Sequence, residues 1–521
     1  MENWKAGLTV ALVSIPLSIS LAIASGATPS AGILTAVYAG AIAALFGSSN
    51  YNIVGPAGAL SGILAAFALT KGAEYMPFLA LLSGVFILAF KILKIERYLV
   101  FVPESTIFGF TLGVAITIAA NQINFALGLQ GLAKHEHFAA NILESLQHIA
   151  QINPVSFISF SVFLGLLFFL LKKTPRFPGA IIVTVIGIAI GAFANSPYSL
   201  FLIDTLKDYY PDIKTVVRLP FVYSFDLDIV FSAFTVAIVA VIETMISARI
   251  ADGLTKTRHN KKKEMVGLGL ANIVSGLFGA LPATAVFART SININSGATH
   301  RASAFINTIF VLIISFFLLP LFKFIPMSTI AAILVFAALR MIETHKLSRI
   351  YQLDKRSFAI GILVSTITVF GDAIYGIMVG TLLSLIFFVE KMTHGHFSAT
   401  VSVKDGKVKQ IRNTEVAINS ENLVYSIKGP LSYMNGMTHL ERFERGLNGY
   451  KHIFIRLKEC SFIDVDGAEI LDQIIESVRS SNRTIALISN DKFINEQLNI
   501  LTKDARKLKR FKRTSDAIKS I

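Results

Sequence analysis

Long apolar stretches separated by short polar loops fill the first 394 residues of the chain. A helix needs about 20 mostly apolar residues to cross a bilayer. The pattern therefore predicts a polytopic α-helical membrane protein. Its fourteen expected segments are 7–26, 30–47, 55–70, 76–93, 99–120, 154–172, 178–194, 228–250, 264–280, 284–298, 302–321, 326–342, 356–372 and 374–392. The third and the tenth segments are too short to cross as plain helices.

Two proline motifs recur at nearly constant spacing and mark an internal repeat. Gly-Pro-Ala-Gly-Ala at 55–59 resembles Leu-Pro-Ala-Thr-Ala at 281–285, and these open the two short segments. A second pair surrounds Pro103 and Pro326. Corresponding prolines are 226 and 223 residues apart. Proline-interrupted apolar segments in matching halves are typical of the binding site of a transporter.

Loop charges give the two halves opposite orientations. If the N-terminus is cytoplasmic, the loops after segments 4, 6, 8 and 12 lie inside and carry clusters of Lys and Arg, as the positive-inside rule requires. The long loops at 121–153 and 195–227 then lie outside. Seven segments per half invert the second half, which predicts a 7+7 inverted repeat of residues 1–194 and 228–394. We expect a multi-pass protein of the inner (plasma) membrane with both termini in the cytoplasm.

The overall composition excludes several classes of function. Hydrophobic residues make up 53% of the chain and charged residues only 16%, against about 25% in soluble domains. The net charge of +15 does not indicate a nucleic-acid partner, because the basic residues fall mostly in short loops. A single cysteine, Cys460, excludes an intramolecular disulfide. No nucleophile–base pattern and no phosphate-binding glycine loop is present, so we expect neither an enzyme, an ATP-driven pump, nor a bound cofactor.

The last 127 residues, 395–521, have a different character. Strand patterns at Leu423–Ile427, Ile453–Leu457 and Ile485–Ile488 alternate with an amphipathic helix at Gly467–Val478. Alternating strands and helices predict a small cytoplasmic α/β domain. The chain therefore divides into a transmembrane domain, 1–394, and this second domain.

The repeated prolines predict an anion site. Proline suits the first turn of a helix, so Pro56 and Pro282 are expected to mark helix N-termini in mid-membrane. Free N–H groups and the helix dipole attract anions there. In inverted halves the two N-termini face each other and share one anion. The alternative is a pair of packing kinks. The candidate substrate-binding residues are Ala57, Gly58, Ala59, Thr284, Ala285 and Val286.

Two ionisable residues interrupt apolar segments and are functional candidates by default. Arg289, in the tenth segment, would supply positive potential to the anion. Glu243, in the eighth, would bind a coupling cation, either H⁺ or Na⁺, and Ser247 one turn later could add an oxygen ligand. A structural Glu243–Arg289 ion pair is the alternative.

Several of these segments together resemble the SulP family of anion transporters, and the C-terminal region resembles a STAS domain. The SulP resemblance is carried by 55–58, 242–253, 258–260, 264–272, 282–284, 288–290 and 296–298, and the STAS resemblance by 429–431 and 462–467. It implies a uracil-permease-like fold with core and gate domains, a homodimer, and secondary transport of sulfate, bicarbonate, chloride or dicarboxylates. It also places the substrate between the third and tenth segments, with the acidic residue supplied by the eighth.

The STAS loop contains Asp464 and Asp466. Phosphorylated STAS proteins carry Ser or Thr where this chain has Asp466. That excludes phosphorylation at this position, and a constant negative charge could imitate it. The resemblance implies a regulatory loop that meets a cytoplasmic partner.

Transport by alternating access, with sulfate or bicarbonate coupled to a cation, is the leading hypothesis. Bicarbonate carriers coupled to Na⁺ tend to have aspartate where this chain has Glu243, so glutamate favours H⁺. An uncoupled exchanger or channel for chloride or dicarboxylate is the alternative, and a sensor built on the STAS domain is a third hypothesis. The sequence leaves the identity of the anion open.

Overall fold

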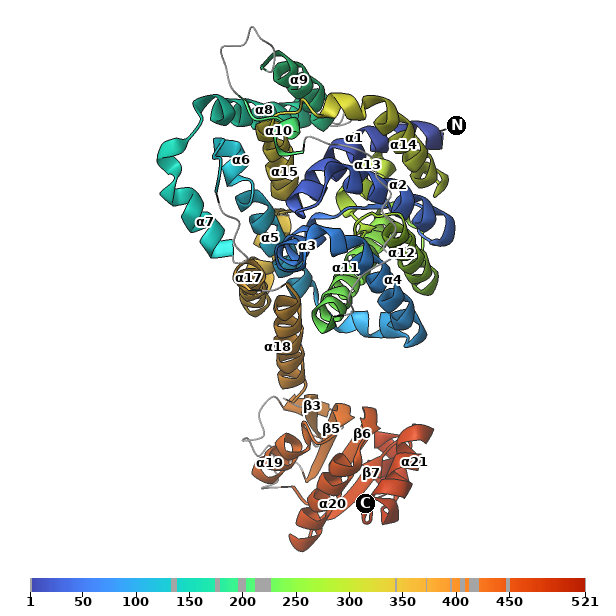
Figure 1. Cartoon of the computed structure of the whole chain (residues 1–521). Coiled ribbons are helices and arrows are strands. Elements are labelled where there is room, and N and C mark those ends of the chain that lie inside the picture. The colour runs from blue at the N-terminus through green and yellow to red at the C-terminus, as the bar shows by residue number, and fades with distance from the viewer. Residues whose placement is uncertain are drawn as a thin grey trace. The chain divides into compact units, whose positions relative to one another are not determined.

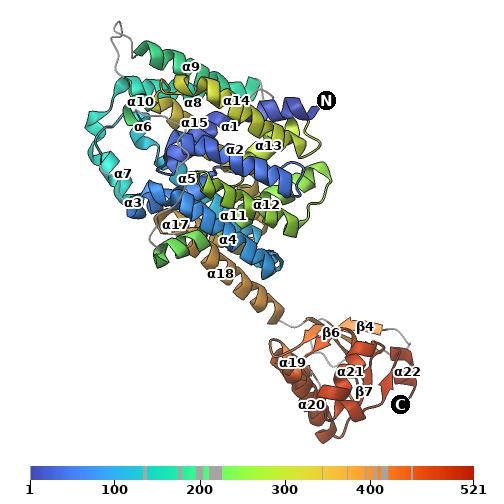
Figure 2. The ribbon, with the colours of Figure 1, turned by 45° about the vertical axis from the view of Figure 1, so that its right-hand side comes forward.

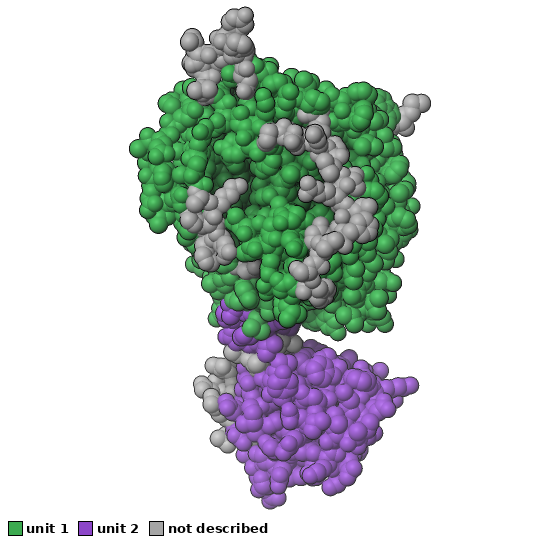
Figure 3. Space-filling model, in the orientation of Figure 1, with its two compact units in different colours: residues 1–382 green, residues 383–521 purple. Residues whose placement is uncertain are grey.

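The structure is a computed structural model that describes residues 2–132, 138–173, 179–194, 203–210, 226–342, 344–371, 373–393, 396–402, 408–411, 421–446 and 450–520. These residues form two compact units, 1–382 and 383–521, coloured separately in Figure 3. Most of the loop at 195–227, expected outside the membrane, is not among the described residues.

Each of the fourteen predicted segments corresponds to a helix. These helices are α1 (Glu2–Ala24), α2 (Pro29–Phe46), α3 (Gly58–Lys71), α4 (Met76–Ile92), α5 (Glu104–Ala120), α8 (Pro154–Lys173), α9 (Gly179–Ala194), α11 (Leu227–Thr255), α12 (Lys261–Leu277), α13 (Phe287–Asn295), α14 (Ala302–Phe322), α15 (Met327–Met341), α17 (Lys355–Phe370) and α18 (Ala373–Thr393). Short connecting helices are η1 (Ala73–Tyr75), η2 (Ile95–Phe101), α6 (Ile123–Leu127), α7 (Phe138–Gln147), η3 (Ile149–Gln151), α10 (Leu206–Tyr209) and α16 (Thr344–Leu353). Within the described part, six helices are long and apolar enough to cross a membrane, judged by length and composition alone.

Two short strands meet at the centre of the first unit. β1 (Val54–Gly55) pairs antiparallel with β2 (Thr284–Ala285), so that Val54 faces Ala285 and Gly55 faces Thr284. β1 leads into α3 and β2 leads into α13. Because the strands are antiparallel, the two helices leave the centre in opposite directions, as an inverted repeat requires.

The prolines of the first motif do not occupy the first helical turn, so that prediction was wrong. α3 begins at Gly58, two residues after Pro56, and α13 begins only at Phe287, five residues after Pro282. In the second half the intervening residues include strand β2, and in the first half Ala57, which follows β1 and Pro56, is extended and serves as the N-cap of α3. Arg289, expected about two turns into its helix, therefore lies in the first turn of α13. The second proline motif is regular, with Pro103 capping α5 and Pro326 capping α15.

Small residues allow the helices around this centre to approach closely. A Cβ added to Gly84 of α4 would lie 2.6 Å from the carbonyl oxygen of Gly269 in α12. Glycine at such crossings lets helix backbones pack directly in a bilayer, where no hydrophobic effect drives helices together. α12 thereby packs on both α4 and α2, and α1 packs on α14, as Figures 1 and 2 show.

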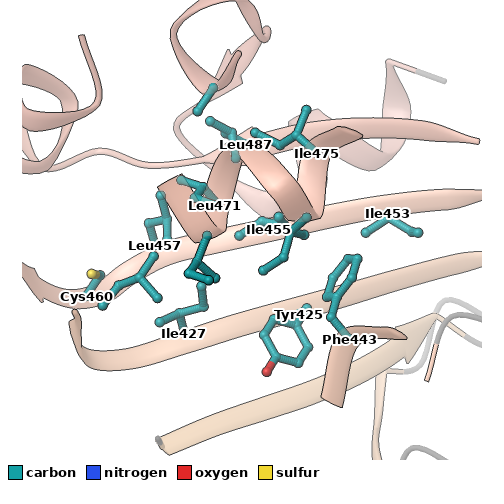
Figure 4. Packing of buried hydrophobic residues seen from close by; sticks show 14 of the residues in the cluster. Tyr425, Ile427, Phe443, Ile453, Ile455, Leu457, Cys460, Leu471, Ile475 and Leu487 are labelled. Carbon is teal, nitrogen blue, oxygen red and sulfur yellow. The ribbon is translucent and has the colours of Figure 1, made fainter. Parts of the chain in front are cut away.

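The second unit contains a six-stranded mixed sheet with the order β4-β3-β5-β6-β7-β8. Its strands are β3 (His396–Ser402), β4 (Val408–Ile411), β5 (Asn422–Leu431), β6 (His452–Ile463), β7 (Thr484–Ile488) and β8 (Arg510–Phe511). Its helices are α19 (Gly436–Gly446), α20 (Val465–Ser480), α21 (Lys492–Leu501), η4 (Ala505–Lys507) and α22 (Thr514–Lys519). Apolar side chains of β5 and β6, such as Ile427 and Ile455, pack against Leu471 and its neighbours on α20 (Figure 4).

Candidate functional site

A cavity of about 820 Å³ lies where α3 and α13 begin. Six of the predicted site residues line it, and they come from three helices. They are Gly58 and Ala59 of α3, Glu243 and Ser247 of α11, and Val286 and Arg289 at the start of α13. Residues from both halves of the chain thus share one cavity, as the repeat predicted.

The two helices present uncapped N-termini at this cavity. The N-cap residues are Ala57 and Val286, whose backbones are extended with φ of −130° and −109°. Neither side chain accepts a hydrogen bond from the helix. The N–H groups of a first helical turn have no partner within the helix, and the dipole adds a partial positive charge there. Both helix starts can therefore donate hydrogen bonds to an anion.

Arg289 joins the two halves directly. Its side chain is 1% exposed, and Nη2 donates a 2.6 Å hydrogen bond to the carbonyl oxygen of Pro56. Nε and Nη1 are also buried and have no acceptor among the described residues. A Cβ on Gly55 would collide with Nη1, so the guanidinium keeps its observed position only with glycine here. The glycine of the motif is thus explained by the arginine of the other half.

Glu243 lines the same cavity and forms no hydrogen bond with Arg289 among the described residues. Its Oε2 atom is buried without a hydrogen-bond partner among the described residues. No ion pair joins the two side chains in the described part of the chain, so the expected structural alternative is not formed. The cavity therefore contains a cationic donor and an anionic acceptor, each with hydrogen-bonding capacity unused by the protein.

The other predicted residues of β2 and α3 lie behind the cavity surface. The hydroxyl of Thr284 donates to the carbonyl oxygen of Ala240 at 2.9 Å and lies 2.8 Å from the hydroxyl of Thr244. Ala285 is fully buried, and its N–H donates to the Thr244 hydroxyl. Ala57 is 3% exposed and serves as the N-cap of α3. These residues fix the backbone that presents the helix starts.

Ser247 is engaged by the protein in this structure. Its hydroxyl donates to Oδ1 of Asn52 at 3.0 Å and lies 3.1 Å from the hydroxyl of Thr290. It therefore ties α11 to the segment before β1 and to α13.

Sequence reasoning missed two polar residues that position this site. The Glu264 carboxylate, only 5% exposed, accepts hydrogen bonds from Ser48 N at 2.6 Å, Ser49 N at 2.7 Å and Asn52 Nδ2 at 2.8 Å. It holds the chain that leads into β1. Asn272 does the same for β2, because its amide donates to Ala283 O and accepts from Ala283 N. A carboxylate and an amide in an otherwise apolar, glycine-rich segment were the available signal.

The predicted STAS loop is ordered by Asp464. Asp464 caps α20 by accepting a hydrogen bond from Gly467 N at 2.8 Å, and it also accepts one from Tyr433 N at 3.1 Å. Asp466 lies exposed in the first turn of α20. Its carboxylate is therefore accessible, whereas that of Asp464 is structural.

Comparison with known proteins identifies close parallels over the whole chain. The sequence model of the Sulfate permease family matches residues 2–364, and that of the STAS domain matches residues 413–517. The putative sulfate transporter YvdB of Bacillus subtilis is 28% identical over 486 residues, which cover 93% of this chain and 90% of YvdB. The bicarbonate transporter BicA of Picosynechococcus sp. is 24% identical over 504 residues, which cover 92% of this chain and 87% of BicA.

Solved structures share the same architecture. Murine Slc26a9, an anion transporter solved in the inward-facing state, matches with a TM-score of 0.85 at 15% identity, covering 100% of this chain and 91% of that chain. The transmembrane domain of BicA matches with a TM-score of 0.64 at 25% identity, and the match covers 73% of this chain and 97% of that domain. The fold is therefore a polytopic helical membrane domain with a 7+7 inverted repeat, joined to a STAS domain, and the protein is a transporter rather than an enzyme. The resemblance in sequence is confirmed: the chain belongs to the sulfate permease (SulP) family.

Proposed function

We propose that this protein is a secondary active transporter of a small anion, sulfate or bicarbonate, and that it works by alternating access. The observation that carries the proposal is the buried guanidinium of Arg289, which lies in a cavity between two uncapped helix N-termini and has two nitrogens without acceptors among the residues that the structure describes. Leaving a buried charged group without partners costs several kcal/mol. An anion that accepts hydrogen bonds from Arg289 and from the first turns of α3 and α13 offsets that cost.

Glu243 couples the anion to a cation in this proposal. With both side chains ionised, the charges of Arg289 and Glu243 cancel, so an added anion leaves this buried part of the cavity net negative, because Arg340, which also lines the cavity, is exposed to solvent. A proton or Na⁺ on Glu243 restores neutrality in a low-dielectric site, where unbalanced charge is expensive. Anion and cation therefore favour each other's binding, which is the basis of symport. The carboxylate oxygen that has no partner in the described structure is the atom that takes the cation.

The relatives support the substrate classes that we propose. YvdB is named as a putative sulfate transporter and BicA as a bicarbonate transporter. We place the transmembrane domain, 1–394, in the plasma membrane with both termini in the cytoplasm. The STAS domain, 395–521, meets a cytoplasmic partner there, and two copies of the chain form a homodimer.

Uptake into proteoliposomes tests the proposal. Labelled sulfate, bicarbonate, chloride and a dicarboxylate are offered with and without Na⁺ and with and without a pH gradient. We expect accumulation of sulfate or bicarbonate that depends on one cation gradient, and loss of that dependence in Glu243→Gln. Cation-coupled uptake that survives in Glu243→Gln would refute the coupling role. Flux that ignores every cation gradient in the unmodified protein would instead establish the uncoupled exchanger or channel.

A further inference from the structure

A second cavity approaches the start of α3 from another side. It has a volume of about 430 Å³, and its lining includes neutral polar side chains near the ends of α5, α6 and α7, among them Thr117, Asn121, Asn124 and Ser145. Its lining and that of the larger cavity have three residues in common, namely Gly58, Ala59 and Ile118. The two cavities therefore meet at the first turn of α3, where one of the proposed anion contacts lies.

The contact that separates the cavities is apolar. Ile118, on α5, is 4% exposed, and a Cβ placed on Gly58 would lie 2.7 Å from its Cδ1 atom. Leu21 of α1 and Met341 of α15 approach the same point, with Cδ2 and Sδ each 3.8 Å from that Cβ position. Three apolar side chains from three helices thus surround the Gly58 backbone. The absence of a side chain on Gly58 is what allows Ile118 to press against the helix start.

Apolar constrictions close membrane pathways because water, and hence a hydrated ion, is excluded from them. An anion held by Arg289 in the larger cavity would have to pass Ile118 to reach Thr117 and Asn121 in the smaller one. Ile118 belongs to α5, whereas the anion contacts belong to α3 and α13, so the contact can open when these helices move relative to each other.

We propose that Ile118, seated on Gly58 and flanked by Leu21 and Met341, is the barrier residue that closes the anion site toward the smaller cavity. This inference rests on the proposed function for the location of the anion. It adds a residue that no part of the repeat motif or of the charged pair indicates. Ile118 determines whether the two cavities are separate compartments or one continuous pathway.

One-sided cysteine labelling tests the barrier without using any substrate. The only native cysteine is Cys460, so Cys460→Ser gives a background without thiols. Ala65→Cys places a thiol in the smaller cavity and Ser291→Cys places one in the larger. A membrane-impermeant maleimide is applied to either face of sealed vesicles. With Ile118 intact, we expect each cysteine to react from one face only, and the two from opposite faces.

Ile118→Ala should open the barrier. We expect labelling from the formerly silent face to rise at least about tenfold, which corresponds to about 1.4 kcal/mol removed from the barrier. Ile107→Ala is the matched control, because it makes the same change on α5 at a residue that lines only the larger cavity. That variant should keep labelling one-sided. Ile118→Val, which shortens the side chain by one methyl group, should give a smaller rise.

Labelling that stays one-sided in Ile118→Ala would overturn the proposal. This holds if the cysteine still reacts from the same face as with Ile118 intact, because that reaction shows that the variant is folded. An equal rise in Ile107→Ala would overturn it as well, because the effect would not belong to the barrier. Since maleimide reports access and not transport, these results are independent of the proposed function. A barrier that opens as expected in a protein that transports no anion would refute only the transport proposal.

Discussion

The two halves of the site have the same backbone plan but different chemistry. Each half contributes a two-residue strand followed by the N-terminus of a helix, and the two strands pair with each other. The first half, Gly55–Ala59, supplies backbone and small side chains, whereas the second supplies the guanidinium of Arg289. Arg289 in turn hydrogen-bonds to Pro56 of the first half. The two copies thus share the backbone geometry of the site, and the second copy carries its positive charge.

The two halves also differ in the hydrogen bonds that hold them in place. Glu264 holds the first half through Ser48, Ser49 and Asn52, all of which precede β1. Asn272 holds the second half by a direct two-bond contact with Ala283. Both supports lie on α12, in the second repeat. The second repeat therefore positions both halves of the site. The internal repeat in the sequence would instead suggest that each half is held by residues of its own repeat.

Removing the charge of the second half should have the largest effect. Arg289→Ala deletes the donor that faces the anion and the bond to Pro56, and a hydrogen bond to a charged group is worth about 1.5–3 kcal/mol. We expect the anion dissociation constant to rise between about tenfold and 150-fold, measured by calorimetry on purified protein. Arg289→Lys keeps the positive charge but lacks the planar guanidinium group. Its anion dissociation constant should therefore lie between that of the unmodified protein and that of Arg289→Ala. Unchanged affinity in Arg289→Ala would remove this residue from the site.

Adding a methyl group to the first half should displace Arg289 without removing it. Gly55→Ala places a Cβ where Nη1 lies, so the guanidinium must move. We expect about a tenfold loss of affinity, equivalent to about 1.4 kcal/mol. Gly62→Ala is the control, since its Cβ would meet only Thr117 Cγ2 at 3.9 Å. Equal effects of the two substitutions would mean that the halves do not interact through Arg289.

Weakening the support of the first half should have a smaller effect on binding. Glu264→Gln replaces one accepting oxygen by an N–H₂ group, so at least one of the buried donors of Ser48, Ser49 and Asn52 loses its partner. A buried unsatisfied group costs about 1–3 kcal/mol. We expect a lower thermal midpoint and a lower maximal uptake rate, with anion affinity changed less than in Gly55→Ala. Lys262→Gln, an exposed change on the same helix, should leave all three measurements unaltered.

A titration in the STAS domain should leave both halves of the site unaffected. Burial, and secondarily the charge of Arg442, lowers the pKa of His439 to about 4. The unfolded chain takes up this proton near pH 6.5, so the folded domain loses stability as pH falls from about 6.5 toward 4, by at most about 3 kcal/mol. Hydrogen exchange of α19 and α20 in the full-length protein, corrected for intrinsic rates, should show this loss.

The matched substitution identifies the histidine responsible. His439→Gln should flatten the pH dependence of exchange in α19 and α20, and His452→Gln should retain it. Anion affinity at constant pH should be the same in both variants. A pH dependence that persists in His439→Gln would assign it to another group.

Much of this architecture could be predicted from the sequence, for a physical reason. The length of apolar segments and the charge of the loops between them are set by the bilayer. The fourteen helices and the opposite orientation of the two halves could therefore be predicted from local sequence patterns. The predicted helix start at Pro282 was wrong because β2 pairs with β1 of the other half, Ala285 with Val54, and local rules do not detect such pairing. At Pro56 the helix begins two residues later, after the extended N-cap residue Ala57. The roles of Glu264 and Ile118 likewise depend on contacts between segments far apart in the chain, whereas Asn272 acts on Ala283, eleven residues later.

The central claim is that one anion is shared by the two helix starts and held by Arg289. A structure determined with selenate, a heavy analogue of sulfate, tests it most directly through the anomalous signal of selenium. We expect a single peak between the N-termini of α3 and α13, within hydrogen-bonding distance of Arg289, and loss of that peak in Arg289→Ala. A selenate peak elsewhere in the membrane domain, or one unchanged in Arg289→Ala, would contradict it.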